Sequence, residues 1–459
     1  MAENNFSLQK TLTMLLDEKK YHSLRDILST MNPADIAAIF DELDQARLPL
    51  LFRLLPKELA AETFVEMEPE AQELLIRGFS DSELKEVIDE LYVEDAVDIV
   101  EELPANVVQR ILSQAEPDMR KQINEILRYP EDSAGSIMTT EYVSLRPNMT
   151  VEEAILRIRR TGIDKETIYT CYVTRGHKRI GLTSVKDLLL CEEDDATNES
   201  IMQEHVITVG TLDDKEQVAQ MFSKYNFLAL PVVDTENRLV GIVTFDDAMD
   251  VMEDEATEDM EKMAAMLPSE HPYMRSTPIE IWKNRIPWLL LLMVSATLTG
   301  IVITKFEDSL AVLPCLTAFI PMLMDTGGNS GSQACVSIIR GISLNEIEFR
   351  DLGKVVWKEI RVSVLCGVCL AVACFAKIVV VDMLLLKSES VSYMVAFVVC
   401  ATMAVTVCLA KIVGSTLPLL AKKLGFDPAV MASPIITTIV DFLSLLVYFA
   451  FATAMLGIG

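Results

Sequence analysis

The chain has 459 residues, of which 51% are hydrophobic and 24% charged, with a mean hydropathy of +0.30 and a formal net charge of −28. These properties separate along the sequence. Residues 1–282 hold 57 acidic and 27 basic side chains, whereas residues 283–459 hold 11 and 13 and nearly all the long apolar runs. The division indicates an acidic soluble part followed by a membrane part and excludes one small domain. It also argues against nucleic acid as a partner, because the soluble part repels phosphates.

The first residues, MAENNFSLQK, contain no basic segment followed by an apolar run, so we expect no cleavable signal and a cytoplasmic N-terminal part. Seven of the nine cysteines lie in the apolar half. Cys366 and Cys369 have the spacing of a metal or redox pair, but they lie inside an apolar run with no second pair nearby. We therefore expect them to be packing thiols.

Residues 1–128 are expected to form helices. Asn32 followed by Pro33 is typical of a helix start, and a similar signal returns at Ser80, 48 residues later. The pairs Leu55-Pro56 and Leu103-Pro104 keep the same offset. A helix-rich repeat of this length predicts a short α-solenoid, acting either as a scaffold or as a regulatory surface.

Residues 129–253 are expected to alternate between strands and amphipathic helices in two similar passages. Each passage begins with a short strand, continues with a helix and ends in a strand pair and a further helix. The expected strands are Tyr142-Val143 and Val206-Ile207, and the expected helices are Val151–Arg160 and Lys215–Tyr225. The passages share a glycine in an aliphatic strand, followed by Ser or Thr and then by Asp three residues later, as in IGLTSVKD at 180–187 and VGIVTFDD at 240–247.

This doubled pattern resembles a tandem pair of cystathionine-β-synthase (CBS) domains, at residues 137–197 and 201–253. The resemblance implies a regulatory α/β module that senses small ligands, often adenine nucleotides such as ATP. Ser184, Asp187 and Thr244 match positions that can hold a ribose.

A very acidic segment, DDAMDVMEDEATEDMEK, follows at 246–262. Asp247, Asp250, Asp254 and Glu258 fall on one stripe of a helix, where like charges repel by a few tenths of a kcal/mol per pair. One interpretation is a solvated acidic face. The other is a connecting or plug helix, residues 254–282, that a divalent cation locks in place.

The remaining chain, residues 283–459, predicts an all-α transmembrane domain, since about 20 apolar residues cross a bilayer. The predicted spans are 286–304, 309–341, 362–384, 392–418 and 428–456. Basic residues cluster in alternate connections, which places the N-terminal domains inside and the C-terminus outside.

Two places in this half break the apolar pattern. Asp441 has no charged neighbour within a dozen positions, and Ser433 and Thr437 share its helical face at intervals of four. A carboxylate in the membrane costs about 2.5–3.5 kcal/mol on insertion scales, which marks a functional candidate. The second place is the segment that contains Gly327, Gly328 and Asn329. It is expected either to line a wet cavity with oxygen donors or to serve close helix packing.

Oxygen donors without His or Cys beside Asp441 favour a hard cation such as Mg²⁺, bound through its hydration water. One carboxylate matches a divalent ion poorly. Two facing copies of Asp441 would match it, which predicts a homodimer in the lipid bilayer with the pore on the two-fold axis.

Across nearly the whole chain, the order of domains resembles the MgtE family of magnesium channels. The carrying motifs are YPEDSAG at 129–135, DEATED at 254–259, PMLMDTGGNSGSQ at 321–333 and SPIITTIVD at 433–441. The resemblance implies a dimeric, Mg²⁺-selective channel of the cell membrane that closes when cytosolic Mg²⁺ is high. It implies filter binding by Asp441, with the glycine-rich span lining the pore.

The resemblance also implies regulatory Mg²⁺ sites between the solenoid, the CBS pair and the connecting helix. The matching residues are Glu216, Asp247, Asp250, Glu255, Glu258 and Asp259, with Asp95 and Asp98 as candidates from the solenoid. Two positions depart from family members. Asn226 stands where close relatives can have aspartate before the expected last CBS strand, and Ser433 stands where some members carry an asparagine one turn below the filter.

Other interpretations remain open. The chain could be a coupled exchanger or a Co²⁺ carrier, or a membrane-anchored nucleotide sensor without transport. An enzyme is not expected, because no pairing of a nucleophile with a base and no metal triad is found.

Overall fold

The computed structural model describes residues 11–41, 43–176, 178–269, 273–274, 276–388 and 390–457. The chain divides into two compact units, Met1–Met252 and Glu253–Gly459, and each is described by itself.

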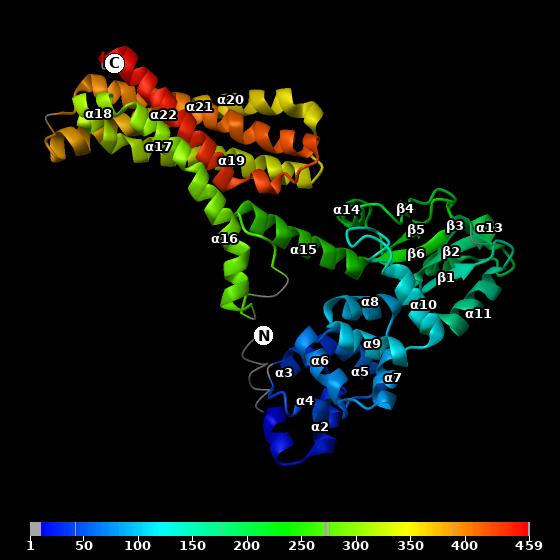
Figure 1. The fold of residues 1–459 in the computed structure, drawn as a ribbon. Coiled ribbons are helices and arrows are strands. Elements are labelled where there is room, and N and C mark those ends of the chain that lie inside the picture. Colours follow the sequence, from blue (N-terminus) through cyan, green and yellow to red (C-terminus); the bar gives the residue numbers. More distant parts are fainter. Residues whose placement is uncertain are drawn as a thin grey trace. The chain divides into compact units, whose positions relative to one another are not determined.

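The first unit begins with a helical domain (Figure 1). Its helices are α2 (Tyr21–Leu28), α3 (Pro33–Asp41), α4 (Leu48–Phe52), α5 (Lys57–Val65), α6 (Pro69–Gly78), α7 (Asp81–Ile88), α8 (Val93–Glu102), α9 (Ala105–Gln114) and α10 (Pro117–Ile126). The starts of α3, α5 and α6 recur 48 residues later as those of α7, α9 and α10. Ser80 and Glu83 form the capping box that begins α7. The helix pattern therefore follows the sequence repeat.

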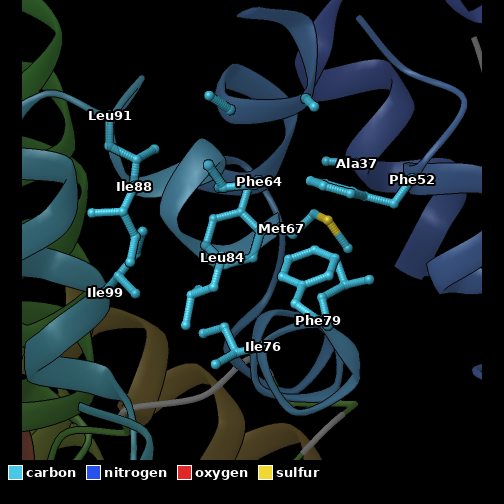
Figure 2. Packing of buried hydrophobic residues seen from close by; sticks show 14 of the residues in the cluster. Ala37, Phe52, Phe64, Met67, Ile76, Phe79, Leu84, Ile88, Leu91 and Ile99 are labelled. Atoms are coloured by element: carbon cyan, nitrogen blue, oxygen red, sulfur yellow. The ribbon is translucent and has the colours of Figure 1, made fainter. Parts of the chain in front are cut away.

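One hydrophobic cluster joins these helices. Figure 2 shows Phe64 and Phe79 close to Phe52, whose ring centroid lies 6.1 and 5.4 Å from theirs. Such aromatic contacts add about 0.5–1.5 kcal/mol beyond area burial. This shared core packs α7 and α8 against the other helices, and α8 carries several acidic residues.

Two three-stranded sheets follow, one in each CBS repeat. In the first, β2 (Thr167–Arg175) pairs in parallel with β1 (Tyr142–Leu145) and antiparallel with β3 (Lys178–Ser184). In the second, β5 (Ala229–Val233) lies in the same way between β4 (Val209–Gly210) and β6 (Leu239–Thr244). The accompanying helices are α11 (Val151–Thr161), α12 (Val185–Leu190), α13 (Asn198–Ile201) and α14 (Lys215–Tyr225).

Two sequence-based expectations in this region were wrong in detail. The strand expected at Val206-Ile207 lies at β4 instead, because Val209 is buried and pairs with Val232, whereas Ile207 is 38% exposed. Asn226 precedes β5 and not the last strand, β6. It ends α14 in the left-handed conformation (φ 54°), which asparagine tolerates better than most residues.

The acidic segment belongs to α15 (Phe245–Met263), which starts directly after β6. The connecting helix expected over 254–282 is therefore not one helix. Its first part is the second half of α15, and its last part opens α16 (Pro278–Ser295). Pro268 lies in the connection between α15 and α16, and Pro278 is the first residue of α16. Because proline has no backbone N–H, a helix that ran through either position would lose a hydrogen bond.

The second unit is a helical bundle (Figure 1). It comprises α16, α17 (Thr297–Lys305), α18 (Glu307–Val312), α19 (Ile320–Ser343), α20 (Leu352–Lys377), α21 (Tyr393–Leu424) and α22 (Ser433–Leu456). Within the described residues, four stretches are long and apolar enough to cross a membrane: Pro278–Lys305, Phe349–Leu385, Tyr393–Leu424 and Ala429–Leu456. The expected span 309–341 is broken into α18, a 3₁₀ turn (Pro314–Phe319) and α19.

Glycines allow α19 to pack closely against its neighbours. A Cβ on Gly331 would lie 2.8 Å from Cγ2 of Ile436, and one on Gly414 of α21 would overlap the carbonyl oxygen of Gly331. Small residues at helix contacts let backbones approach where no hydrophobic effect drives association. The α19–α22 contact therefore depends on glycine at 331, and the α19–α21 contact on glycine at 414.

Replacing Gly414 by alanine should destabilise the bundle by about 1–3 kcal/mol, because the added methyl group meets backbone that cannot move aside. The measurement is the thermal unfolding midpoint of the full chain in detergent. Gly300→Ala is the matched control, since nothing lies within 4 Å of its added Cβ. Equal midpoints for Gly414→Ala and the control would contradict this packing role.

Candidate metal sites and ion path

An acidic interface lies inside the first unit, between the helical domain and the CBS part. Glu94, Asp95 and Asp98 come from α8, Glu166 precedes β2, and Asp246 and Asp247 open α15. The carboxylates of Asp95, Glu166 and Asp247 are close enough to repel one another. The fold thus gathers negative charge from segments far apart in sequence.

This crowding changes the proton affinity of the groups. Burial, followed by repulsion from Glu166 and Asp247, raises the pKa of Asp95 to about 7. Burial raises the pKa of Asp247 to about 6, against the opposing hydrogen bonds from Thr244. Packing and repulsion by Asp247 also raise the pKa of Asp98, but its side chain reaches solvent at the rim, so water screens part of the effect.

Glu94 and Glu166 are two carboxyl groups of this interface that each have a buried oxygen atom. Glu94 is only 7% exposed, and one oxygen of each group is buried with no hydrogen-bond partner among the described residues. Burial raises the pKa of both groups. Repulsion from Glu166 adds to the effect on Glu94, and repulsion from Asp246 adds to the effect on Glu166. Sequence reasoning missed them: Glu94 sits beside the predicted Asp95, whereas nothing in the local sequence signals Glu166.

The other predicted regulatory residues of this unit lie on helices of the second CBS repeat. Glu216, in the first turn of α14, accepts a hydrogen bond from Gln220 at 3.0 Å. Asp250 lies on α15, one turn after Asp247. Both are carboxylates, a ligand type that Mg²⁺ prefers.

The predicted ribose positions cap helices. Oγ of Ser184 accepts from the backbone N–H of Asp187 at 3.0 Å and donates to its carboxylate at 2.7 Å, which starts α12. Thr244 donates to Asp247 at 2.6 Å at the start of α15. These bonds explain the repeated Ser/Thr and Asp pattern locally, and they fix Asp187 and Asp247 at the ends of β3 and β6.

In the second unit, the end of α15 is tied to the helical bundle. Lys262 forms ion pairs with Glu258 of its own helix and with Asp427 at 2.7 Å. Asp259 accepts a hydrogen bond from Ser343 at 3.3 Å, and burial plus repulsion from Asp427 raises its pKa. Met263 packs against a buried cluster that includes Ile436 and Val440 of α22. Glu258 and Asp259 therefore lie at the bundle end where α19 finishes and α22 begins, and Glu255 lies one turn earlier on α15.

The candidate ion path follows α19 and α22. Asp441 is half-buried on α22, and its carboxylate interacts with that of Asp325 on α19. Asn329, one turn further along α19, donates to Asp325 at 3.1 Å. Asp325 belongs to the glycine-rich motif at 321–333, but the sequence does not reveal its importance, because its partner Asp441 is more than a hundred residues away.

The glycines lie on the buried side of α19, whereas Asp325 and Asn329 are exposed. Gly327 and Gly328 are buried, and an added Cβ would lie 2.7 Å from Thr406 and 3.0 Å from Thr437. Thr437 itself donates to the backbone oxygen of Pro434. This geometry matches the packing alternative for the two glycines and leaves Asp325 and Asn329 on the exposed face. Ser433 begins α22, and its side chain lies outside the described residues.

Within the described ranges, no group of three or more His, Cys, Asp or Glu side chains is placed to hold a metal ion. The acidic sites are pairs and rows of carboxylates. Such sites suit a cation that keeps several water molecules, as Mg²⁺ usually does. The structure therefore has the features of a membrane protein with an acidic N-terminal unit and a pair of carboxylates among its apolar helices.

Comparisons with known proteins agree with this class. A family described as a divalent cation transporter matches residues 320–451, an MgtE intracellular N domain matches 31–132, and CBS domains match 134–193 and 199–254. The magnesium transporter MgtE of Thermus thermophilus is 36% identical over 98% of both chains. That of Bacillus subtilis is 31% identical over 97% of this chain and 96% of its own.

Two solved structures resemble the first unit. The cytosolic domain of the Mg²⁺ channel MgtE in complex with ATP is 37% identical, with a TM-score of 0.50 over 53% of this chain and 99% of its own. The soluble part of a magnesium transporter is 32% identical, with a TM-score of 0.52 over 56% of this chain and all of its own. The chain belongs to the MgtE family of magnesium transporters.

Raising the pH without divalent cations should loosen α8 from the CBS part. Because docking raises the pKa of Glu94 and Glu166, docking is easiest where they stay protonated and weakens as pH rises above the ordinary carboxyl value of 4.5 through the raised values. The measurement is hydrogen exchange of α8 amides in the full chain with EDTA, at pH 6.0 and 8.5, corrected for the intrinsic rate. Protection should fall several-fold.

Glu94→Gln, which stays neutral, should reduce this pH dependence, because only the other carboxyls of the interface then titrate, whereas Glu62→Gln on the exposed face of α5 should keep it in full. Identical profiles in the wild type and Glu94→Gln would refute the assignment.

Proposed function

We propose that this protein is a Mg²⁺-selective channel that mediates magnesium uptake across the cell membrane and is closed by cytosolic Mg²⁺. The names of its relatives support the cargo. The observation that carries the proposal is the pair Asp325 and Asp441, two carboxylates on neighbouring apolar helices. Neither forms an ion pair within the described part of the chain, although a charged group in a membrane normally pairs or lines a polar path.

The proposed membrane domain has five spans. Four of them are the apolar stretches described above, and the fifth is α19. Its 24 residues, Ile320–Ser343, are long enough to cross the hydrocarbon core at 1.5 Å per residue. Its glycines and polar residues make it less apolar than the others, in keeping with a helix packed between α21 and α22. Basic residues such as Lys422 and Lys423 favour the cytoplasmic side, which places the C-terminus outside.

The proposed functional unit is a homodimer. A divalent ion is matched by two copies of Asp441 facing each other across a two-fold axis, with Thr437, Ser433 and Asn329 nearby. The helix α16 has no buried residue within one chain, so lipid or a second copy must cover its apolar surface. A dimer axis close to α19 and α22 would bring Asp325 of both copies beside the same ion.

Gating is proposed to follow from the acidic surfaces. At low Mg²⁺, repulsion separates α8, the CBS part and α15. At high Mg²⁺, bound ions offset the repulsion, and the end of α15 is held over the bundle at Ser343 and Asp427. The proposed regulatory residues are Asp95, Asp98, Glu216, Asp247, Asp250, Glu255, Glu258 and Asp259.

ATP is proposed as a second cytosolic ligand, supported by the related cytosolic domain solved with ATP. Ser184, Asp187 and Thr244 are the candidate contacts. A sensor without transport, a coupled exchanger and a Co²⁺ carrier are the alternatives. Absence of flux at every internal Mg²⁺ level would favour the sensor, dependence on Na⁺ the exchanger, and strong competition by Co²⁺ the carrier.

Replacing Asp441 by alanine should abolish Mg²⁺ entry into dye-loaded proteoliposomes, at least 100-fold below the wild type, because the filter loses its charge. Asp308→Asn removes a carboxylate from the exposed helix α18 and should leave entry unchanged. Size-exclusion chromatography checks folding. Equal flux through the wild type and Asp441→Ala would refute the filter.

Neutralising Asp254, Glu255, Glu258 and Asp259 together should leave the channel conducting at high cytosolic Mg²⁺, because Mg²⁺ then has no carboxylates through which to hold α15 in the closed position. The measurement is patch-clamp current against internal Mg²⁺. Neutralising the exposed residues Glu58, Glu62, Glu66 and Glu70 is the charge-matched control and should preserve closure. Unchanged closure in the first variant would contradict the gating mechanism.

A further inference from the structure

A cavity of about 580 Å³ lies in the first CBS repeat, at the end of its sheet. It is lined by residues that follow β1, by the end of β2, by α11 and by α13. The residues that give it its character are Arg146, Arg157, Arg175 and Glu199. Its volume falls in the range typical of small-molecule sites, about 300–1,000 Å³.

Three arginines in one cavity are unexpected in so acidic a unit. Arg175 forms an ion pair with Glu199 at 2.9 Å. Neither Arg146 nor Arg157 has a side-chain partner among the described residues, although acidic side chains are abundant nearby in the sequence. The three arginines and Glu199 therefore give the cavity a net charge of +2.

The walls of the cavity are fixed by buried hydrogen bonds. The buried Asn198 donates to the backbone oxygen of Arg146 at 3.0 Å, and the backbone N–H of Glu199 donates to Pro147 at 3.0 Å. Across the floor, the hydroxyls of Ser144 and Thr174 are 2.9 Å apart. Arg146 and Arg175 thus extend from backbone positions that the fold holds in place.

The cavity is separate from the candidate nucleotide positions. Arg175 pairs with Lys178 at one end of the β2–β3 ladder, whereas Ser184 pairs with Thr170 at the other end. The two ends are six residue steps apart along β3, about 20 Å of strand. One small ligand at Ser184 and Asp187 cannot also fill the arginine cavity.

The second CBS repeat provides an internal comparison. Its ladder aligns with the first through Thr170 and Ala229, which pair with Ser184 and Thr244. In this alignment Arg175 corresponds to Asp234, Arg146 to Gly210 and Arg157 to Met221. The same fold is thus built without any of the three arginines, so they are not required for folding.

We propose that this cavity binds a small phosphate-bearing anion. Guanidinium groups suit phosphate because each presents planar, paired N–H donors to its oxygens. Arg146 and Arg157 would supply these donors, and the hydroxyls of Ser144 and Thr174 would supply neutral ones. Such a ligand would give the first CBS repeat an anionic input that is independent of Mg²⁺ and of the proposed ATP contacts.

The test uses the full chain in detergent with EDTA and titrates inorganic phosphate by calorimetry against chloride at equal ionic strength. The variant Arg146→Gln/Arg157→Gln should bind phosphate at least tenfold more weakly than the wild type. Arg159→Gln/Arg160→Gln is the matched control, because both residues are exposed on α11 and outside the cavity, and it should bind normally. Circular dichroism checks that each variant folds.

AMP is the second probe and separates two sources of phosphate. Weaker AMP binding in the cavity variant, with normal binding in Asp187→Asn, assigns the cavity to a nucleotide phosphate. Weaker AMP binding only in Asp187→Asn, with phosphate binding still lost in the cavity variant, assigns it to a phosphate ester without a nucleoside. No saturable phosphate binding in the wild type, or equal binding in the cavity variant, overturns the proposal whatever the Mg²⁺ flux.

Discussion

Repulsion between carboxylates that the fold holds side by side is the constraint on which the rest of this protein depends. Two unit charges 4 Å apart interact by about 4 kcal/mol at an effective dielectric constant of 20. The interface of Glu94, Asp95, Glu166 and Asp247 therefore opposes its own formation unless protons or cations occupy it. Whether such an interface forms depends on the pH and on the concentration of divalent cations, which is the property that a sensor of divalent cations needs.

The membrane unit contains charged groups that form ion pairs and carboxylates that repel each other. Lys377 pairs with Asp382 at 2.8 Å, and the buried Lys411 lies 3.8 Å from Glu359, so these groups compensate each other. Asp325 and Asp441 repel instead, and the hydrogen bond from Asn329 only orients the first. On the proposed mechanism this difference separates structural charges from those that meet the ion. The buried side of α19, with Gly327, Gly328 and Gly331, supplies the rigid packing that keeps the two carboxylates in position.

The two CBS repeats show how one fold carries different chemistry. Both start their last helix with a hydroxyl bonded to an aspartate, at Ser184 and Thr244. In the second repeat that aspartate, Asp247, also belongs to the acidic interface. Only the first repeat has the arginine cavity at the far end of its sheet. A module with two ends of opposite charge can respond separately to cations and to anions.

The sequence by itself determined the local features of this protein. Helix caps such as Ser80, the repeated strand–helix units, the apolar spans and the isolated Asp441 depend on residues close together in the chain, so patterns reveal them. The start of β4 and the end of the connecting helix were placed wrongly, because pairing with Val232 and the prolines after Met263 decide them. Only the tertiary structure brought Glu166 to Glu94 and Asp325 to Asp441, and only it turned the glycines of α19 inward. Those outcomes depend on contacts between distant segments, whose electrostatic and packing energies no local pattern contains.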